Sequence, residues 1–256
     1  MNVEVTTRGS VDPELAKEIA DRIRDLGAAV DRDPIDARVV LMQEENPRIA
    51  QAARAEGDVR FNGYTIRGRV AAETMDQAVN DLVERLREQL RRHVDRLNTK
   101  QRTPPTVGEG EWRSGAWTPP RPPRSWRPPG ERQVIRRKSF ALEPMDAIDA
   151  AGDMAALDHE FYLFKDSDTG ADSLIYRRDD GHLAVIAPQD APEAPEDGGP
   201  IRERSRYSEP LSLADAISEM DELNHRFLFF VNAETGRGNV LYLRYDGHYG
   251  LIEPAS

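Results

Sequence analysis

The sequence predicts an α+β protein: an N-terminal βαβββα domain of the double-stranded-RNA-binding-like kind, a linker, and two tandem βαβββ domains paired as an intramolecular pseudo-dimer. Three observations predict this organisation. The first hundred residues alternate strand and helix patterns, a stretch rich in Pro, Arg and Trp follows, and the rest of the chain contains one segment twice. The expected domains and linkers are residues 1–98, 99–133 (linker), 134–188, 189–200 (linker) and 201–256.

The first strand and the first helix have clear local signals. Val3 and Val5 alternate with polar residues, which is typical of a half-buried strand. Asp12 is suited to the N-cap position and Pro13 to the first helical position, and an apolar stripe at helical spacing follows. We expect this helix to stop at Gly27.

Three strands and a long helix complete the N-terminal domain. The strands are expected near residues 35–43 and 50–61 and, after an Asn-Gly turn, at 64–72. Thr74 and Gln77 form a capping box for a last helix that runs to about residue 97. With both helices on one face of the sheet, the other face is left free to contact a partner.

The last of these helices carries arginines beside its apolar face. Arg85, Arg92 and Arg96 follow one border of the apolar arc, and Arg87 and Arg91 follow the other. Acidic residues occupy the outermost face, where they can pair with the arginines. Spacing alone leaves two interpretations equal: a solvated, ion-paired helix and a surface for nucleic acid.

Composition restricts the function classes. With 38% apolar and 32% charged residues, the 256-residue chain favours several small cores over one large core. It has no cysteine for a disulfide, thiolate ligand or nucleophile, no membrane-spanning apolar run and no signal-peptide pattern. No catalytic constellation, G-x-G-x-x-G or phosphate loop is present. We therefore expect a cytoplasmic protein that is not an enzyme and has no cofactor and no metal.

The net charge of −11 is unevenly distributed. Residues 1–98 carry 16 basic and 19 acidic groups, residues 99–138 carry 10 and 3, and residues 139–256 carry 9 and 24. The three parts therefore have net charges of −3, +7 and −15. A basic middle between a nearly neutral head and an acidic tail indicates separate roles for the three parts.

The repeat is an ungapped duplication with an offset of 66 residues. Residues 143–188 align with 209–254 and share 18 identities in 46 positions. A strand precedes each copy, near 134–140 and near 201–207, and a helix capped by Asp146 or Ser212 follows. Three further strands come next, and an Asp-Gly pair gives a two-residue hairpin signal between the last two.

One strand of each copy is apolar on both faces. A single helix covers one face of a sheet, so the other face needs a partner, which the second copy supplies within the same chain. Two independent domains are the alternative. The expected inter-repeat interface consists of Phe161, Tyr162, Leu163, Phe164, Tyr176, Phe227, Phe229, Phe230 and Tyr242.

Two further patterns resemble metal sites. Residues 166–173 have acids at alternate positions, as in a calcium loop, but Gly170 stands where a third ligand belongs, which favours a turn. Four histidines recur in register between the copies, at 159, 182, 225 and 248. A shared metal site is one interpretation of them, and packing beside the hairpins is the favoured one.

These residues resemble a known family. The βαβββα order that ends in DLVERLREQLRRH resembles the N-terminal domain of bacterial ribosome hibernation promoting factors. The repeat, with its EPM or EPL start, DTG or ETG turn and DGH motif, is similar to the C-terminal domain of their long forms. Because this chain has two such domains, it resembles the tandem-domain variant described as a ribosome-associated factor under hypoxia.

The resemblance implies a function in translation during stress or dormancy. Family members place the N-terminal domain in the messenger channel and decoding region of the small subunit, where basic residues of the last helix contact 16S rRNA. Arg85, Arg91 and Arg92 match that basic motif, and Arg87 and Arg96 extend it. The expected partners are 16S rRNA and ribosomal proteins, and the expected state is a monomer on single ribosomes. The alternative is an interaction scaffold that binds a protein partner through its acidic domains.

The linker holds all three tryptophans of the chain among arginines and Pro-Pro pairs. Prolines prevent regular structure there, so stacking on bases and docking on a ribosomal protein are the two contacts expected, with a bare spacer as the alternative. The expected contact residues are Trp112, Arg113, Trp117, Arg121, Arg124, Trp126 and Arg127.

Overall fold

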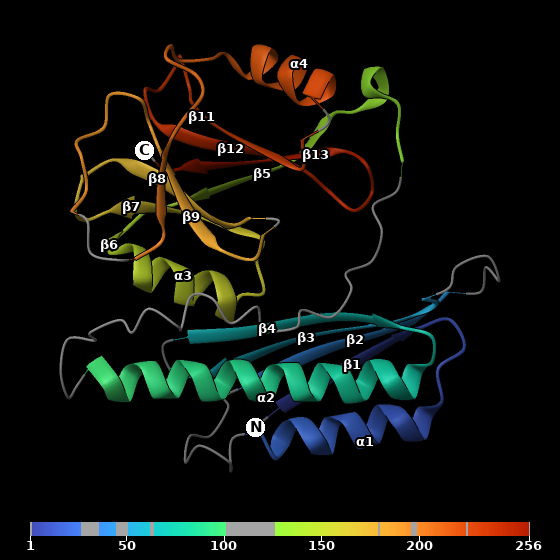
Figure 1. Ribbon diagram of the computed structural model, residues 1–256. Helices are drawn as coiled ribbons and strands as arrows, with labels where there is room; N and C mark the ends of the chain where they lie inside the picture. Colours follow the sequence, from blue (N-terminus) through green and yellow to red (C-terminus); the bar gives the residue numbers. More distant parts are fainter. Residues whose placement is uncertain are drawn as a thin grey trace. The chain divides into compact units, whose positions relative to one another are not determined.

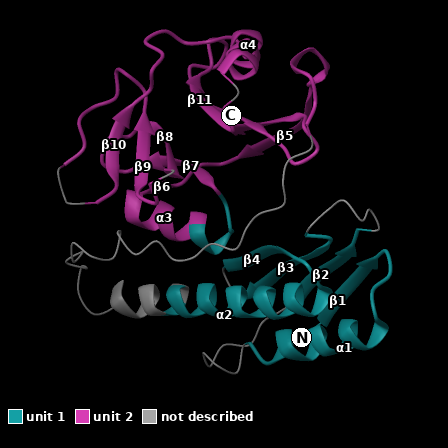
Figure 2. Ribbon diagram, turned by 45° about the vertical axis from the view of Figure 1, so that its right-hand side comes forward, with its two compact units in different colours: residues 1–106, 116–122, 155–159 teal, residues 107–115, 123–154, 160–256 magenta. Residues whose placement is uncertain are grey.

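The computed structural model describes residues 2–26, 36–44, 51–61, 64–100, 126–178, 180–195, 199–223 and 225–255, without the side chains of residues 93 and 95–100. The chain divides into two compact units (Figure 2). One unit consists mainly of residues 1–106, and the other mainly of residues 123–154 and 160–256.

The N-terminal unit has the predicted βαβββα order. Its elements are β1 (Asn2–Arg8), α1 (Pro13–Arg24), β2 (Asp36–Gln43), β3 (Ala53–Phe61), β4 (Tyr64–Ala72) and α2 (Met75–Lys100). The strands form one sheet in the order β1-β2-β3-β4, with β1 parallel to β2 and the other neighbours antiparallel. Both helices lie on one face of this sheet (Figure 1).

Both helices begin with the predicted caps. The Asp12 carboxylate accepts a hydrogen bond from the backbone N–H of Glu14 at 2.9 Å. At α2, Thr74 Oγ1 accepts one from the backbone N–H of Gln77 at 3.3 Å. These bonds satisfy N–H groups that have no partner within the helix. The predicted stop of the first helix, Gly27, lies outside the described residues.

The core of this unit lies between the helices and the sheet. Its fully buried side chains include Ile19, Ile23, Val39, Leu41, Val59, Ile66, Val70, Leu82, Leu86 and Leu90. Gly68 allows α2 to approach β4 closely, because a Cβ there would lie 2.9 Å from Leu82 Cδ1. The apolar face of α2 is thereby fixed on the sheet, and its arginines are left at the borders.

The C-terminal unit contains both repeats. The first has β5 (Val134–Phe140), β6 (Pro144–Met145), α3 (Ala147–Ala156), β7 (Phe161–Asp166), β8 (Asp172–Arg177) and β9 (Leu183–Ala187); the second has β10 (Ile201–Arg204), α4 (Leu213–Leu223), β11 (Phe227–Val231), β12 (Gly238–Leu243) and β13 (Tyr249–Pro254). The helix caps are those predicted. Asp146 accepts from the N–H of Asp149 at 2.7 Å, and Ser212 from that of Asp215 at 3.2 Å.

The first strand of each repeat joins the sheet of the other repeat. β5 pairs in parallel with β13, and β10 pairs in parallel with β9. The two sheets therefore have the orders β10-β9-β8-β7-β6 and β11-β12-β13-β5. The order of elements in the sequence did not indicate this exchange of first strands between the repeats. Because β10 directly follows β9 along the chain, the free edge of β9 is the nearest sheet edge with which it can pair.

The two sheets pack through the faces that α3 and α4 leave uncovered (Figure 1). The cluster between them consists of Leu163, Leu174, Phe229 and Val240, with Phe161, Leu142, Ile186, Phe227 and Ile252 packed around it. Equivalent residues meet each other, as in Phe161 and Phe227, whose ring centroids are 5.0 Å apart. Contact between equivalent positions is characteristic of a two-fold arrangement.

Where the two repeats meet around this two-fold axis, their residues are complementary and not identical. The first copy has Asp172 where the second has Gly238. Asp172 accepts from the Gly238 N–H at 3.0 Å and pairs with the Arg237 guanidinium at 2.7 and 3.1 Å. A Cβ on Gly238 would lie 2.7 Å from the Cβ of Asp172. The glycine therefore makes room for the aspartate of the other copy.

The Asp-Gly pairs form hairpin turns, with a longer loop than predicted. Arg178 N–H bonds to His182 O at 2.8 Å, and Gly181 N–H bonds to Arg178 O at 3.0 Å, which leaves three residues in the loop. A two-residue turn of type I′ needs positive φ at both central residues. Gly181 has a φ of 86° and Gly247 has one of 79°, whereas the preceding aspartates have no positive φ. The turn of the second repeat, where Arg244 N–H bonds to His248 O at 2.8 Å and Gly247 N–H bonds to Arg244 O at 3.1 Å, is therefore of the type I plus glycine-bulge kind.

A buried arginine fixes the chain just before β5. The Arg132 side chain is 7% exposed; it pairs with Asp221 of α4 at 3.3 Å and donates to the Tyr249 hydroxyl of β13 at 3.1 Å. Burial, and then the hydrogen bond to Asp221, raises the pKa of Tyr249 to about 12. The segment that leads into β5 is thus attached to the second repeat, and β5 joins the sheet of that repeat.

Replacing Gly250 by alanine should destabilise the C-terminal unit. The Tyr242 ring lies on Gly250, and a Cβ there would be 2.3 Å from Tyr242 Cζ. We expect Gly250→Ala to lower the free energy of unfolding by about 1–3 kcal/mol, because the ring must leave its position. Urea unfolding followed by tyrosine fluorescence measures this. Gly130→Ala is the control, since nothing lies within 4 Å of a Cβ there. Equal stability of the two variants would contradict the expectation.

Candidate nucleic-acid interface

The predicted arginines of α2 lie at the edge of the N-terminal unit. Arg87, Arg91 and Arg92 are exposed, with 50%, 62% and 48% of their side-chain surface accessible. Arg85 is only partly exposed, and the side chain of Arg96 lies outside the description. Three of the five predicted residues are therefore open to a partner.

Among the described residues, neither α2 nor any other helix is long and apolar enough to cross a membrane.

Acidic residues of the same helix hold these arginines. Glu84 pairs with Arg87, and Glu88 pairs with both Arg91 at 3.1 Å and Arg92 at 2.9 Å. Desolvation raises the pKa of Glu88, but the hydrogen bonds from Arg92 and Arg91 outweigh it, so the pKa is lowered. Glu88 is therefore ionised at neutral pH. Glu88, Arg91 and Arg92 together have a net charge of +1. A phosphate must compete with Glu88 for the two guanidinium groups.

The open face of the N-terminal sheet carries charges that the sequence analysis did not identify. Asp36 pairs with Arg60 and Asp58 with Arg67, in each case directly across two neighbouring strands. Alternation along the strands could have shown this, because the residues between the buried positions of β2, β3 and β4 are largely Arg, Asp and Glu. Arg38 has no ion pair among the described residues. The paired charges on this face largely neutralise one another, as those on α2 do.

The linker is described only at its end. Trp126 is 81% exposed. Arg127 lies 3.8 Å from Glu131, and its backbone carbonyl accepts a hydrogen bond from Arg132 at 2.9 Å. The other predicted linker residues, which lie outside the described part of the chain, are Trp112, Arg113, Trp117, Arg121 and Arg124.

Six of the nine residues predicted for the inter-repeat interface lie between the sheets. Phe161, Leu163, Phe227 and Phe229 belong to the cluster there, and rings of Tyr176 and Tyr242 pack against Phe227 and Phe161 at centroid distances of 5.3 and 5.6 Å. The other three differ from the prediction. Tyr162 and Phe164 pack under α3, and Phe230 packs under α4, because alternate residues of a strand point to opposite faces.

Two family models match the chain. The model described as Sigma 54 modulation protein / S30EA ribosomal protein matches residues 3–98. The model described as Sigma 54 modulation/S30EA ribosomal protein C terminus matches twice, at residues 129–185 and 201–251. The two C-terminal matches correspond to the two repeats.

The names of curated relatives refer to ribosomes and translation. A ribosome hibernation promotion factor of Deinococcus radiodurans is 31% identical over 193 residues, which cover 72% of this chain and 94% of the relative. A dormancy associated translation inhibitor of Mycobacterium tuberculosis is 35% identical over 154 residues, and the match covers 56% of this chain and 55% of that relative. The chain thus spans about half the length of the second relative.

Two solved structures match part of the chain. A ribosomal subunit interface protein from Coxiella burnetii and the N-terminal domain of Thermus thermophilus Protein Y are 18% and 23% identical, each with a TM-score of 0.31. Each match covers 36% of this chain, with 97% and 99% of the respective structure.

Proposed function

We propose that this chain, which belongs to the Sigma 54 modulation/S30EA ribosomal protein family in its long form, binds the ribosome and inhibits translation. The names of its relatives, ribosome hibernation promotion factor and dormancy associated translation inhibitor, support this proposal. In finer terms, the N-terminal unit binds the messenger channel and decoding region of the small subunit. Occupation of that region excludes messenger and transfer RNA from an idle ribosome.

The exposed arginines of α2 carry this proposal. Arg87, Arg91 and Arg92 are presented by a helix whose apolar face is held on a sheet, so their backbones are fixed before binding. Guanidinium groups bind phosphate oxygens in pairs of parallel hydrogen bonds. The N-terminal third has a net charge of −3, and the basic linker, whose residues 99–133 have a net charge of +4, adds long-range attraction to RNA.

The C-terminal unit determines how many ribosomes one chain engages. The inner faces of the two repeats cover each other, and their first strands are exchanged within the chain. Over the described residues, the inner faces are occupied by this pairing and are not available to the repeat of a second molecule. We therefore infer that the protein is a monomer and holds single ribosomes inactive without joining them in pairs.

Sedimentation of ribosomes with the full chain tests the function. We expect the protein to sediment with small subunits and with single ribosomes, and binding to fall steeply as salt rises, because each phosphate contact releases counterions. We also expect messenger-dependent peptide synthesis to stop in the same mixture. Ribosome pairs formed on adding the protein would contradict the self-covered C-terminal unit, and absence of co-sedimentation at low salt would contradict ribosome binding.

The alternative function is a scaffold that binds a protein partner. The charge of −15 in residues 139–256 favours this alternative, since acidic surfaces repel RNA and attract basic proteins. The salt series separates the two functions. Co-sedimentation that is insensitive to salt, and that survives removal of the α2 arginines, would favour the scaffold.

A further inference from the structure

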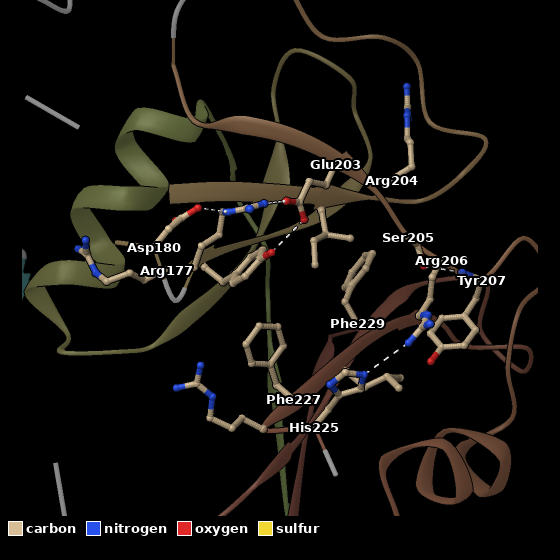
Figure 3. Close-up of a pocket in the computed structure, with 15 residues that line it drawn as sticks. Arg177, Asp180, Glu203, Arg204, Ser205, Arg206, Tyr207, His225, Phe227 and Phe229 are labelled. Atoms are coloured by element: carbon tan, nitrogen blue, oxygen red, sulfur yellow. Dashed lines mark hydrogen bonds and ion pairs between the residues drawn. The ribbon is translucent and has the colours of Figure 1, made fainter. Parts of the chain in front are cut away.

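A groove in the C-terminal unit lies between the end of β10 and the start of β11. It has a volume of about 740 Å³ and is lined by residues of both repeats (Figure 3). Tyr176, Phe227 and Phe229 contribute aromatic side chains to it, while Arg206 and His225 stand at one end. Small-molecule sites are typically about 300–1,000 Å³ and combine apolar walls with a few polar groups.

Positive charge is concentrated at this groove. Residues 139–256 contain nine Lys and Arg residues, and five of them line it, against the described acids Asp180 and Glu203. Arg178 pairs with both acids, and Arg204 points away and bonds to the carbonyls of the loop after β9 (Figure 3). The groove is therefore basic, although residues 139–256 have a net charge of −15.

Arg206 and His225 form the most informative contact. Arg206 Nη1 lies 3.4 Å from His225 Nε2, and both side chains are exposed. Neither has a carboxylate partner among the described residues. A guanidinium beside an imidazole, without an acid between them, is arranged to donate hydrogen bonds to an anion. Figure 3 shows the pair facing the same side of the groove as Tyr207.

The fold does not require this charge. By the 66-residue offset, the second copy has Leu243 where the first has Arg177, and the first copy has Glu160 where the second has Arg226. The position of Arg206 corresponds to Phe140 at the other end of the unit. The repeats share the residues that build their hairpins and helices, yet these three of the five groove arginines have no basic counterpart in the other copy.

We propose that this groove binds a nucleoside phosphate, with the phosphate at Arg206 and His225 and the base against Phe227 and Tyr176. The aromatic rings supply a stacking surface, and the guanidinium and imidazole groups supply phosphate donors at its end. The nucleoside phosphate is a free nucleotide or a residue of single-stranded RNA, which share this chemistry. The RNA source rests on the proposed ribosome binding, whereas the free nucleotide does not.

Titration of the full chain tests the site. The probes are adenosine 5′-monophosphate, adenosine, inorganic phosphate and an oligoadenylate of about eight nucleotides, within the range that a single-stranded site covers. We expect the monophosphate to bind more tightly than adenosine or inorganic phosphate, because both ends of the groove contribute. We expect the double variant Arg206→Ala, His225→Ala to lose about tenfold or more in affinity for the monophosphate. Calorimetry measures both.

Two control variants and the oligoadenylate probe distinguish the possible outcomes. Arg136→Ala removes an exposed charge from β5 and should leave binding unchanged. Arg91→Ala with Arg92→Ala should leave monophosphate binding intact even where small-subunit binding is lost, which separates this site from the proposed function. Tighter binding of the oligoadenylate that depends on Arg206 would assign RNA as the source, and equal binding would assign a free nucleotide. No difference between the groove variant and the wild type, or inorganic phosphate binding as tightly as the monophosphate, would overturn the proposal.

Discussion

A chain that ends at Pro200 should no longer be a monomer. Removing residues 201–256 takes β13 away from β5 and β10 away from β9, and it uncovers the inner face of β7 and β8. The exposed face includes Phe161, Leu163 and Leu174, which pack on the second repeat in the intact chain. An uncovered apolar sheet with free edges associates with another sheet.

The truncated chain has a defined way to associate. β5 of one molecule can take the place of β10 on the β9 edge of another, as the two repeats exchange strands in the intact chain. Analytical ultracentrifugation at micromolar concentration should give a mass above that of one chain, rising with concentration, whereas the intact chain should sediment as a monomer. A truncated chain that stays folded and monomeric would contradict the inferred role of the second repeat.

Asp172 provides a sharper form of this experiment. In the intact chain it lies over Gly238 and pairs with Arg237, but in a pair of truncated chains it meets a second Asp172. Two carboxylates at that spacing repel each other, and their Cβ atoms have no room. We expect Asp172→Gly to tighten association of the truncated chain. The same substitution in the intact chain should lower its stability and leave it monomeric.

Local patterns were sufficient to predict most elements. The apolar spacing of α2 fixes which side meets the sheet, so the positions of Arg87, Arg91 and Arg92 at its borders follow from a period of 3.6 residues. The caps at Asp12 and Thr74 were predictable for the same reason, because they depend on residues close in sequence.

Features that depend on distant residues could not be predicted. Phe161, Tyr162, Leu163 and Phe164 are all apolar, so no polar residue indicates which pair faces α3; only the packing of that helix decides. A strand pattern at residues 134–140 likewise does not tell which sheet edge it joins. The contact between Arg206 and His225 joins two segments that carry no common motif, and only the fold brings them together.

Replacing Arg91 and Arg92 by alanine should weaken binding to the small subunit more than any other double substitution on α2. Both side chains are exposed and pair with Glu88 of the same helix, and loss of each such pair should cost the helix no more than about 0.5 kcal/mol. Each lost contact to a phosphate should cost about 1.5–3 kcal/mol of binding free energy. Binding of labelled protein to small subunits, measured as a function of salt, gives both affinity and salt slope.

The shared acid and a second helix give this prediction its controls. Glu88→Gln should strengthen binding several-fold, because it removes the carboxylate that competes with phosphate for both guanidinium groups. Lys17→Ala with Arg24→Ala removes the same number of charges from α1, where each is paired with an acid three residues away. We expect that control to change the affinity less than the α2 variant does. The slope of log K against log salt should flatten by about 1 for each α2 arginine removed. Unchanged affinity and slope in the folded α2 variant, or an equal loss in the α1 control, would show that RNA does not contact Arg91 and Arg92.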